Sequence, residues 1–441
     1  MSRKTNKNIT TYSLVRDMLK KVLVVTDPLS PGGASKHARE VLKILPKLGL
    51  EVKLYIPFIH AIPQSPEEKE RKYLNLKELE RNGVEVFPEV WKYLEMEKEK
   101  ENIFPYLLTL TSGYIPKKDM EFSNDLRENF SLVYDMSENE YHFKVSHMIA
   151  KKLHVPLVIL LQSESYANSF GRGYRKVLGI KGLFYDLGIT YIFMFNRRRF
   201  VNALREGVLR GILSVSRAII KQSKLERLAQ DYKVYTNVLK PANAIDGTSI
   251  SHFRSKKVKE NFALYAGRIT YLKGIIDLIK IAKETNVKIM LAGSFDNHKE
   301  MERLFSKFPP NLVYLGSFMN NELYKIISNS KVTLLPSYKE SFSLITMESL
   351  ALDTPVIAYN LPAINEIYGD IKAVIKIPVG NYKLMAKTLE SLMEKDIREL
   401  FDPKVEELIK FYSSWEKVAE ATLHELENVK NWLQLPLKTY M

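Results

Sequence analysis

"LLPSYKESFSLITMESLALDTPVIAY", residues 334–359, decides the fold. It begins in a short apolar run, crosses a polar turn, continues as an apolar helix pattern and ends in a second short run. Short apolar runs separated by helices predict parallel strands that are covered on both faces. Two carboxylates, Glu340 and Glu348, lie in the turn and in the helix. Because a buried carboxylate needs a donor to keep its charge, Glu348 is expected to face a polar partner or ligand.

The same alternation of strands and helices continues on both sides of this stretch. Further strands are expected at 262–269, 287–293, 312–318 and 373–377 in the C-terminal half, and at 20–27, 51–57, 130–137 and 155–162 in the N-terminal half. A chain of 441 residues also exceeds one ordinary hydrophobic core. The sequence therefore predicts an α/β protein with two doubly wound, Rossmann-like domains. Their expected bounds are 1–238, completed by 415–441, and 239–414.

The composition is that of a globular protein, with 45% apolar and 27% charged residues. Cysteine is absent, which excludes disulfides and thiolate metal sites. No apolar run reaches the roughly 18–20 residues that a membrane-spanning helix needs, and no cleavable signal pattern is visible. A cytoplasmic location is expected by default.

The loop "AGRITYLKGI" places cationic groups after another strand. Gly267 and Arg268 end the strand, and Lys273 opens the following helix. A guanidinium, an ammonium and free helix N–H groups at one strand end could clamp a diphosphate, although an ordinary polar loop would show the same pattern. Because ligands of such sheets bind at the carboxyl ends of the strands, this loop and the Glu340 turn are expected to face one pocket.

Simpler explanations remain open for three of these features. Glu340 could be an ordinary acid near a helix N-terminus, favoured by the helix dipole, and Glu348 could be solvated. The turn "DPLSPGGAS" after the first strand carries Gly32 and Gly33, which would let the backbone approach an anion. Its spacing differs from a P-loop, and a plain tight turn would also explain it.

Taken in order, these motifs resemble the GT-B glycosyltransferases of family 4, with the strongest likeness from Phe262 to Asp370. The spacing Glu, seven residues, Glu matches the paired glutamates of that family, and "LAxxTPVIA" follows as expected. "AGRITYLKG" resembles its phosphate loop and "SPGGAS" its N-terminal glycine loop. "SSWEKVAEATLHELENV" resembles the C-terminal helix that crosses back to the first domain.

The resemblance implies a retaining hexosyltransferase that uses a UDP- or GDP-linked hexose, with no resident metal or permanent cofactor. Arg268 and Lys273 would hold the donor diphosphate, Glu340 the sugar hydroxyls and Glu348 the ribose. Catalytic roles would thus fall to Glu340, Arg268 and Lys273, with the leaving phosphate accepting the acceptor's proton. Further donor-binding positions by resemblance are Gly32, Gly33, Gly267, Ser341, Phe342 and Ser343.

The acceptor side departs from the family pattern. Family members often carry histidines at the ends of two N-terminal strands, where this chain has Asp135 and Gln162, with Glu164 nearby. These three residues are the acceptor-side candidates. His142 and His147, on the helix between the two strands, are expected to be partly exposed.

Positive charge is concentrated in one segment. The net charge is +15, and 165–227 holds thirteen basic against three acidic residues. An aromatic-rich run there leads into Arg197, Arg198 and Arg199, which a buried helix with solvated arginines would explain. Alternatively Phe193 and Phe195 enter a membrane surface while the arginines meet anionic lipid. That hypothesis suits a glycan or lipid-linked acceptor and an enzyme peripheral to the inner membrane face.

Two other classes of function compete with this interpretation. A basic nucleic-acid-binding protein would explain the charge, but no RRM, KH or helix-turn-helix pattern is present. A sugar-nucleotide epimerase would keep the GT-B fold, whereas a phosphorylase would need a pyridoxal lysine for which no signal is seen. We expect nucleotide-sugar as the small-molecule partner, no nucleic acid, and a monomer or homodimer.

Overall fold

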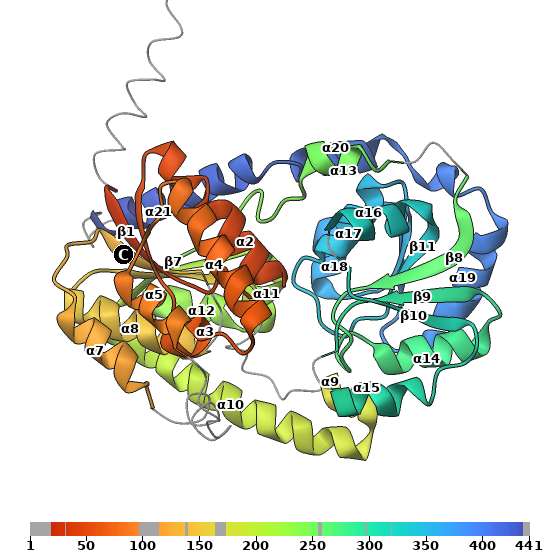
Figure 1. Ribbon diagram of the computed structural model, residues 1–441, viewed down its shortest axis with the longest axis horizontal. Helices are drawn as coiled ribbons and strands as arrows, with labels where there is room; N and C mark the ends of the chain where they lie inside the picture. The colour runs from red at the N-terminus through yellow and green to blue at the C-terminus, as the bar shows by residue number, and fades with distance from the viewer. Residues whose placement is uncertain are drawn as a thin grey trace, which may run out of the picture. The chain divides into compact units, whose positions relative to one another are not determined.

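The computed structural model describes residues 19–30, 32–96, 114–136, 140–163, 173–254, 258–295, 298–318 and 320–434. The chain divides into two compact units. Unit 1 comprises Met1–Ser169, Tyr191–Ala242 and Trp415–Met441, and unit 2 comprises Phe170–Thr190 and Asn243–Ser414. Each unit contains one sheet with helices on both faces (Figure 1).

Unit 1 is built on a seven-stranded parallel sheet with the order β3-β2-β1-β4-β5-β6-β7. Its strands are β1 (Lys21–Val25), β2 (Glu51–Tyr55), β3 (Glu85–Val86), β4 (Leu132–Asp135), β5 (Leu157–Leu161), β6 (Leu209–Ser214) and β7 (Tyr235–Val238). Every residue of β4 and β5 is buried, as expected where helices cover both faces of a parallel strand. The direction of strand addition reverses between β1 and β4, which pair from Val22 with Leu132 onward.

The helices of unit 1 alternate with its strands along the chain, as in βαβ units. They are α2 (Gly33–Leu42), the 3-10 helix η1 (Leu45–Leu48), α3 (Phe58–Ala61), α4 (Pro66–Arg81), α5 (Pro88–Glu95), α7 (Lys117–Asp125), α8 (Glu140–Leu153), α11 (Arg217–Gln222), α12 (Leu225–Asp231) and α21 (Trp415–Gln434). The last of them, α21, packs on α2, η1, β6 and β7. The C-terminal helix therefore returns to the N-terminal sheet, as predicted.

Unit 2 repeats the topology with six parallel strands in the order β10-β9-β8-β11-β12-β13. They are β8 (Glu260–Ala266), β9 (Lys288–Ala292), β10 (Leu312–Gly316), β11 (Ser330–Leu335), β12 (Val356–Tyr359) and β13 (Val374–Ile377). The helices are α13 (Gly247–Ser251), α14 (Ile275–Glu284), α15 (His298–Phe305), α16 (Asn320–Asn329), α17 (Leu344–Ala351), α18 (Pro362–Tyr368), α19 (Tyr382–Glu394), η2 (Ile397–Leu400) and α20 (Pro403–Phe411). Two Rossmann-like domains are thus confirmed.

The two units divide the chain differently from the predicted bounds in two respects. Unit 1 continues to Ala242 where the prediction ended the first domain at 238. Residues 170–190 group with unit 2, although they precede β6 of unit 1 in sequence. They include α9 (Gly173–Leu178) and the start of the long helix α10 (Ile180–Arg205), which has residues in both units. The Asp186 carboxylate accepts hydrogen bonds from the backbone N–H groups of Tyr174 and Arg175, at 3.0 and 2.8 Å, and so ties α9 to α10.

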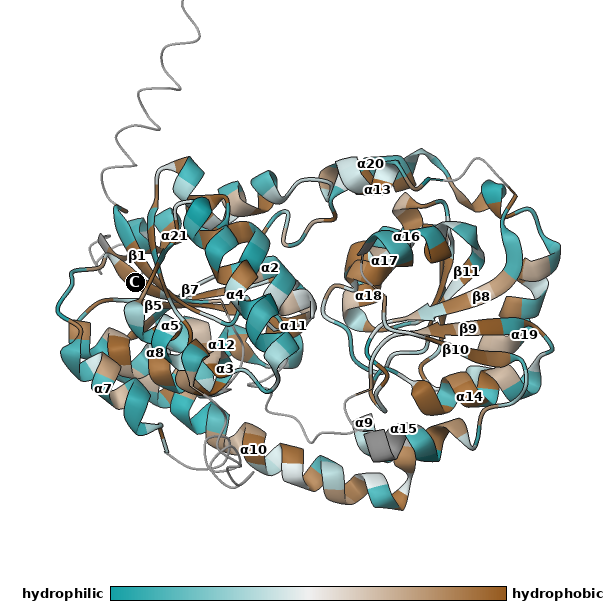
Figure 2. Ribbon diagram, in the orientation of Figure 1, coloured by the Kyte–Doolittle hydropathy of each residue, from teal (hydrophilic) through white to brown (hydrophobic). Residues whose placement is uncertain are grey.

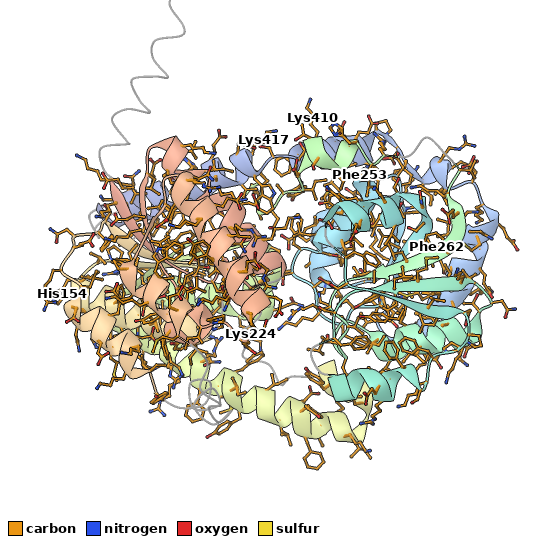
Figure 3. The ribbon with its side chains drawn as sticks, in the orientation of Figure 1. His154, Lys224, Phe253, Phe262, Lys410 and Lys417 are labelled. Atoms are coloured by element: carbon orange, nitrogen blue, oxygen red, sulfur yellow. The ribbon has the colours of Figure 1, made fainter. Side chains whose placement is uncertain are left out.

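Hydropathy follows the layers, because the strands are largely hydrophobic and the outer helix faces polar (Figure 2). Among the side chains labelled in Figure 3, Phe262 lies in the core of unit 2 and is 5% exposed. His154 and Lys410 are exposed, each at the end of a helix. The carboxyl ends of the strands in each unit are therefore the places where polar loops can form a site on a rigid sheet.

Candidate active site

The loops after β8 and β11 meet at the carboxyl edge of the unit 2 sheet. Lys273 Nζ donates a hydrogen bond to Glu340 Oε1 at 2.7 Å. The Glu340 side chain is 8% exposed and that of Lys273 30%, so the pair is partly shielded from water. A backbone bond from Tyr338 N to Leu272 O, at 2.8 Å, joins the same two loops. The structure therefore brings together the carboxylate and the ammonium that the sequence placed on separate loops.

Glycines make this close approach of the loops possible. Gly274 has φ +84°, and a Cβ there would lie 2.0 Å from the Pro336 carbonyl oxygen. Gly293, after β9, has φ +150°, and a Cβ there would lie 1.8 Å from the Gly267 carbonyl oxygen. Side chains other than hydrogen fit neither position. The glycines of "AGRITYLKG" and "AGSF" thus hold neighbouring strand ends in contact.

Arg268 follows the end of β8 by two residues, at the same edge of the sheet as the pair. The Tyr265 hydroxyl donates to the Arg268 carbonyl at 2.8 Å. Burial raises the pKa of Tyr265, and the negative charge of Glu340 raises it further, whereas the positive charge of Arg268 lowers it. The charges of Glu340 and Arg268 thus both act on the buried Tyr265 hydroxyl. The Arg268 side chain is exposed and makes no ion pair or hydrogen bond with the residues that the structure describes. Its guanidinium can therefore serve a ligand.

Glu348 is buried in the first turns of α17. It is 7% exposed, and Oε1 lies 3.4 Å from the Tyr324 hydroxyl that donates to it. Burial raises the pKa of Tyr368 well above its ordinary value. Tyr412 and the carboxylates of Glu340 and Glu348 raise the same pKa further. Because Glu348 is buried, the alternative that it is solvated is wrong. Both glutamates raise the pKa of the same buried side chain, Tyr368.

The residues just before α17 adopt an unusual backbone. Ser343 has φ +68°, which is rare for a residue other than glycine and marks positions of stored strain. Its carbonyl accepts from the Tyr368 hydroxyl at 2.9 Å, and its Oγ lies 2.9 Å from Thr346 Oγ1. Ser341 is half-buried beside it. Phe342 is 4% exposed and packs on Tyr412, so a donor could use its backbone but not its ring.

In unit 1, the glycine loop precedes α2 at the carboxyl end of β1. Gly32 has φ +132° and caps α2, and nothing lies within 4 Å of the place where its Cβ would be. Gly33 is the first residue of α2. This leaves open space over the helix start, which a backbone approach to an anion requires.

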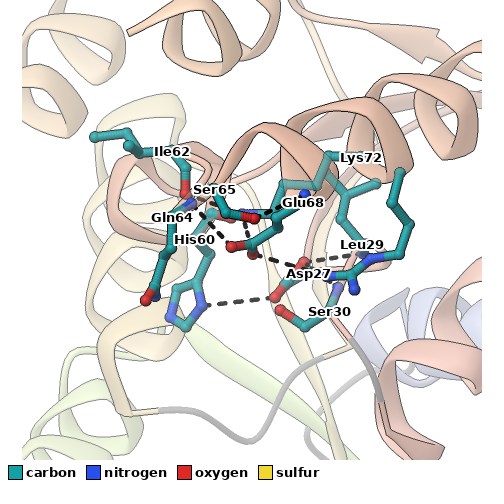
Figure 4. Close-up of polar contacts among 10 residues, drawn as sticks. Asp27, Leu29, Ser30, His60, Ile62, Gln64, Ser65, Glu68 and Lys72 are labelled. Atoms are coloured by element: carbon teal, nitrogen blue, oxygen red, sulfur yellow. Dashed lines mark hydrogen bonds and ion pairs between the residues drawn. The ribbon is translucent and has the colours of Figure 1, made fainter. Parts of the chain in front are cut away.

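A cluster at the carboxyl edge of the unit 1 sheet escaped the sequence interpretation. Asp27, two residues after β1, has Oδ2 3.6 Å from His60 Nδ1 on α3 (Figure 4). The rings of His60 and His142 meet edge-on with centroids 4.5 Å apart. The cluster lies beside the reversal of strand order between β1 and β4, where ligands of doubly wound sheets bind. Asp27, two residues after the end of β1, was the signal that could have found it.

The burial of His142 corrects the expectation that it is partly exposed. Neither ring nitrogen is exposed, and neither has a hydrogen-bond partner among the described residues. Burial and the adjacent His60 lower the pKa of His142 well below its ordinary value, so the ring is neutral. His147 is partly exposed as expected, with Nε2 2.9 Å from Glu206 Oε2.

The backbone around His60 is held rigidly. Lys72 is buried and donates to the carbonyls of His60 and Ile62 at 2.8 and 3.0 Å, while Glu68 pairs with Lys72 at 3.1 Å (Figure 4). On its other side, Asp119 accepts from the Phe58 N–H at 3.0 Å. An imidazole fixed in this way beside a carboxylate can orient a hydroxyl or accept its proton.

The residues expected on the acceptor side have partners within unit 1. Asp135 is buried and accepts from Ser146 Oγ at 3.0 Å. Gln162 Nε2 donates to the Met136 carbonyl at 3.1 Å and so joins the ends of β5 and β4. Glu164 lies outside the described residues. Acceptor binding by these three side chains stays a prediction.

The acid stability of unit 1 tests the charge of Asp27. Burial favours a raised pKa for Asp27, but contacts with His60 and Ser30 outweigh it and hold the pKa below its ordinary value. A carboxyl whose pKa is depressed in the folded state stabilises the fold at pH values above its pKa in the unfolded chain, roughly 3.9. This stabilisation is lost as the pH falls toward the folded-state pKa. We expect Asp27→Asn to lose about 2 kcal/mol at pH 7, the range for hydrogen bonds to a charge, and clearly less at pH 2, because the stabilisation declines only between the unfolded pKa and the much lower folded pKa; the measurement is urea unfolding. Exposed Asp125→Asn is the control; equal losses at both pH values would contradict this account.

Comparison with known proteins agrees with this geometry. Residues 248–410, which include the Arg268, Lys273, Glu340 and Glu348 loops, match the family model for glycosyl transferases group 1. This segment is therefore similar to glycosyl transferases group 1. The capsular polysaccharide biosynthesis glycosyltransferase CapM of Staphylococcus aureus is 25% identical over 205 residues, which cover 43% of this chain and 53% of CapM. The chain spans about half the length of the curated relatives that it matches.

Solved structures extend the likeness beyond residues 248–410 to the fold of nearly the whole chain. Sucrose-phosphate synthase of Thermosynechococcus elongatus aligns with a TM-score of 0.63 at 14% identity, over 93% of this chain and 99% of that one. Anabaena HepE in complex with UDP and glucose aligns with a TM-score of 0.56 at 15% identity, over 94% and 100%. At these identities the likeness concerns the fold, and it confirms the predicted GT-B fold with two Rossmann-like domains.

Proposed function

We propose that the chain is a retaining glycosyltransferase that moves a hexose from a UDP- or GDP-linked donor to a glycan or lipid-linked acceptor. The observation that carries the proposal is the Lys273–Glu340 pair, 2.7 Å apart beside the exposed Arg268, at the carboxyl edge of the unit 2 sheet. These residues lie inside the segment that matches the family model for glycosyl transferases group 1. They combine cations for a diphosphate with a carboxylate for sugar hydroxyls.

The proposed chemistry follows from where charge develops. Glycosyl transfer passes through an oxocarbenium-like state, so negative charge builds on the departing nucleotide diphosphate. Arg268 and Lys273 would stabilise that charge, and preorganised groups of this kind contribute about 3–4 kcal/mol each. Glu340 would hold Lys273 in place and accept hydrogen bonds from the sugar, while Glu348 would bind the ribose. The departing phosphate would accept the proton of the acceptor, and the proposal assigns no resident metal.

The names of similar proteins support a sugar donor and leave a choice of acceptor. HepE was solved with UDP and glucose. A relative 25% identical over 143 residues is an alpha-galactosylglucosyldiacylglycerol synthase from Streptococcus pneumoniae, whose name implies a lipid acceptor. CapM takes part in capsular polysaccharide biosynthesis. We assign the acceptor to the Asp27–His60 edge of unit 1, so Asp27→Asn should raise the KM for an acceptor and leave that for the donor unchanged.

Thermal stability in the presence of nucleotides tests the donor assignment. A ligand at 100 times its Kd stabilises the folded state by about 2.7 kcal/mol. We expect UDP or GDP, and one of their hexose derivatives, to raise the melting temperature, and Arg268→Ala to abolish the shift because it removes a diphosphate contact. ATP at the same concentration controls for a general effect of phosphate.

The outcomes separate the proposed function from its rivals. If neither UDP, GDP nor their sugars shift the melting temperature, the donor assignment is wrong. Conversion of a nucleotide-sugar into its epimer without any acceptor would identify an epimerase instead. Salt-sensitive binding of RNA, with no response to nucleotide-sugars, would favour the nucleic-acid-binding alternative.

A further inference from the structure

One face of α10 carries a continuous apolar row that is exposed. The row, called here the apolar stripe, consists of Ile180, Phe184, Leu187, Tyr191 and Met194, which are 82%, 73%, 45%, 54% and 65% exposed. Steps of four and three residues keep all five within about 40° of one line along the helix. Single exposed apolar residues are ordinary, whereas a contiguous row indicates a surface that binds something.

The opposite face of α10 is already packed. Asp186, Asn196 and Phe200 are buried, and on an ideal helix they lie about 120–160° from the apolar stripe. Asp186 binds the start of α9, and the Phe200 ring stacks on Phe143 with centroids 5.8 Å apart. The rotation of the helix is therefore set by its buried side, and among the described residues the apolar stripe stays exposed.

The charges around the apolar stripe are positive. Lys181 flanks it and Arg198 continues its line by one further step of four residues, both exposed. Asp186 is the one acidic residue in α10, and its carboxylate is used by backbone N–H groups of Tyr174 and Arg175. Hydrophobic residues appear along much of α10 in Figure 2. A partner for this face must therefore be both apolar and anionic.

These requirements favour a lipid surface over two alternatives. A second copy of the same face would bring Lys181 and Arg198 against like charges, which disfavours association. Nucleic acid would use the arginines but would gain nothing from five apolar side chains along one line. A bilayer with anionic headgroups offers phosphate at the surface and an apolar layer directly beneath it.

We propose that α10 lies in the surface of an anionic membrane, with the apolar stripe in the headgroup–acyl boundary and Lys181 and Arg198 on lipid phosphates. No helix among the described residues is long and apolar enough to cross a membrane. The contact face differs from the one the sequence suggested, because Phe193 and Phe195 are half-buried and Arg197 donates to the Ser223 carbonyl at 2.8 Å. A role in reaching a lipid-linked acceptor rests on the proposed function; membrane binding itself does not.

Vesicle flotation at low salt tests the proposal on the full chain. We expect the protein to float with vesicles of phosphatidylcholine and phosphatidylglycerol and to remain in solution with phosphatidylcholine alone. The triple variant Phe184→Ser, Leu187→Ser, Met194→Ser should lose at least tenfold in partitioning, since it removes three inserted side chains. Lys181→Gln with Arg198→Gln should weaken binding and reduce its salt dependence.

A matched control replaces exposed apolar residues elsewhere. Leu74, Met120 and Leu384 are 60%, 41% and 39% exposed and lie on α4, α7 and α19. The triple serine variant at these positions should bind vesicles as the unchanged protein does. A tryptophan at Leu187 should shift its fluorescence to the blue with anionic vesicles, which reports insertion at that site.

Three results would overturn the proposal. The first is failure of the unchanged protein to float with anionic vesicles; the second is unchanged flotation of the apolar stripe variant. The third is a dimer in sedimentation equilibrium that dissociates in this variant, which would assign the apolar stripe to a second copy. The nucleotide-induced melting shift of the same variants reports on the donor site separately, so a failed membrane test leaves the proposed function standing.

Discussion

Glu340→Gln is expected to lower turnover at saturating donor by about 10²–10³-fold, while the melting temperature stays near that of the unchanged protein. Glutamine keeps the size of the side chain and removes its charge. The charge-assisted bond to Lys273 Nζ, 2.7 Å long, is then lost, and the ammonium that should meet the donor diphosphate is no longer oriented. One preorganised group of this kind accounts for about 3–4 kcal/mol of the barrier, hence the magnitude.

The measurement is release of nucleoside diphosphate from whichever nucleotide-sugar raises the melting temperature. Glu390→Gln, at an exposed position of α19 in the same unit, is the matched control and should retain full turnover. Arg268→Ala belongs to the same test, because its exposed guanidinium is assigned to the diphosphate. Full turnover in Arg268→Ala would remove that assignment, and full turnover in Glu340→Gln would show that the charge is structural.

Gly293→Ala is expected to give the largest loss of stability of any single methyl addition considered. The new Cβ would lie 1.8 Å from the Gly267 carbonyl oxygen, and the residue would have to keep φ near +150°. Left-handed or mirror-β backbone costs an alanine about 1–2 kcal/mol, and forced displacement of a packed backbone costs about 1–3 kcal/mol more. We expect a loss of about 3 kcal/mol, measured by urea unfolding of unit 2 followed by circular dichroism.

Gly316→Ala separates the two causes of that loss. Gly316 ends the neighbouring strand β10 with φ +96°, and no atom lies within 4 Å of its Cβ position. Only backbone strain remains there, so the loss should be about 1–2 kcal/mol. Similar losses of stability in the two variants would contradict the view that Gly293 is required by the close approach of the loops after β8 and β9. A weakened nucleotide-induced melting shift in Gly293→Ala would further connect this approach to the donor site.

Interactions that depend on local sequence were predictable. The strand and helix at residues 334–359 form where their apolar pattern places them, as β11, α17 and β12. The meeting of Lys273 and Glu340 was also predictable, because both follow strands whose carboxyl ends lie on one edge of a parallel sheet. Hydrophobic periodicity and turn chemistry act over a few residues, so these features are encoded where they occur.

Contacts between loops in unit 1 depended on the order of the strands. Asp27 and His60 meet because β1 and β2 are neighbours in the sheet, and His142 joins them because α8 packs beside β1. Nothing in the sequence around His142 distinguishes a buried imidazole from one at the surface, since its helix mixes apolar and polar residues. The pairing order that decides these contacts is a property of the whole sheet.

The apolar stripe shows the same division between local pattern and tertiary packing. The amino-acid sequence by itself determined that residues 180–205 contain many apolar and basic side chains, and that the chain forms two Rossmann-like domains. Only the tertiary structure decided that Phe193 and Phe195 turn partly inward while Phe184, Leu187 and Met194 face outward. The reason is that the sequence of a helix with apolar residues on several sides does not specify which side is buried. The residues against which the helix packs decide this.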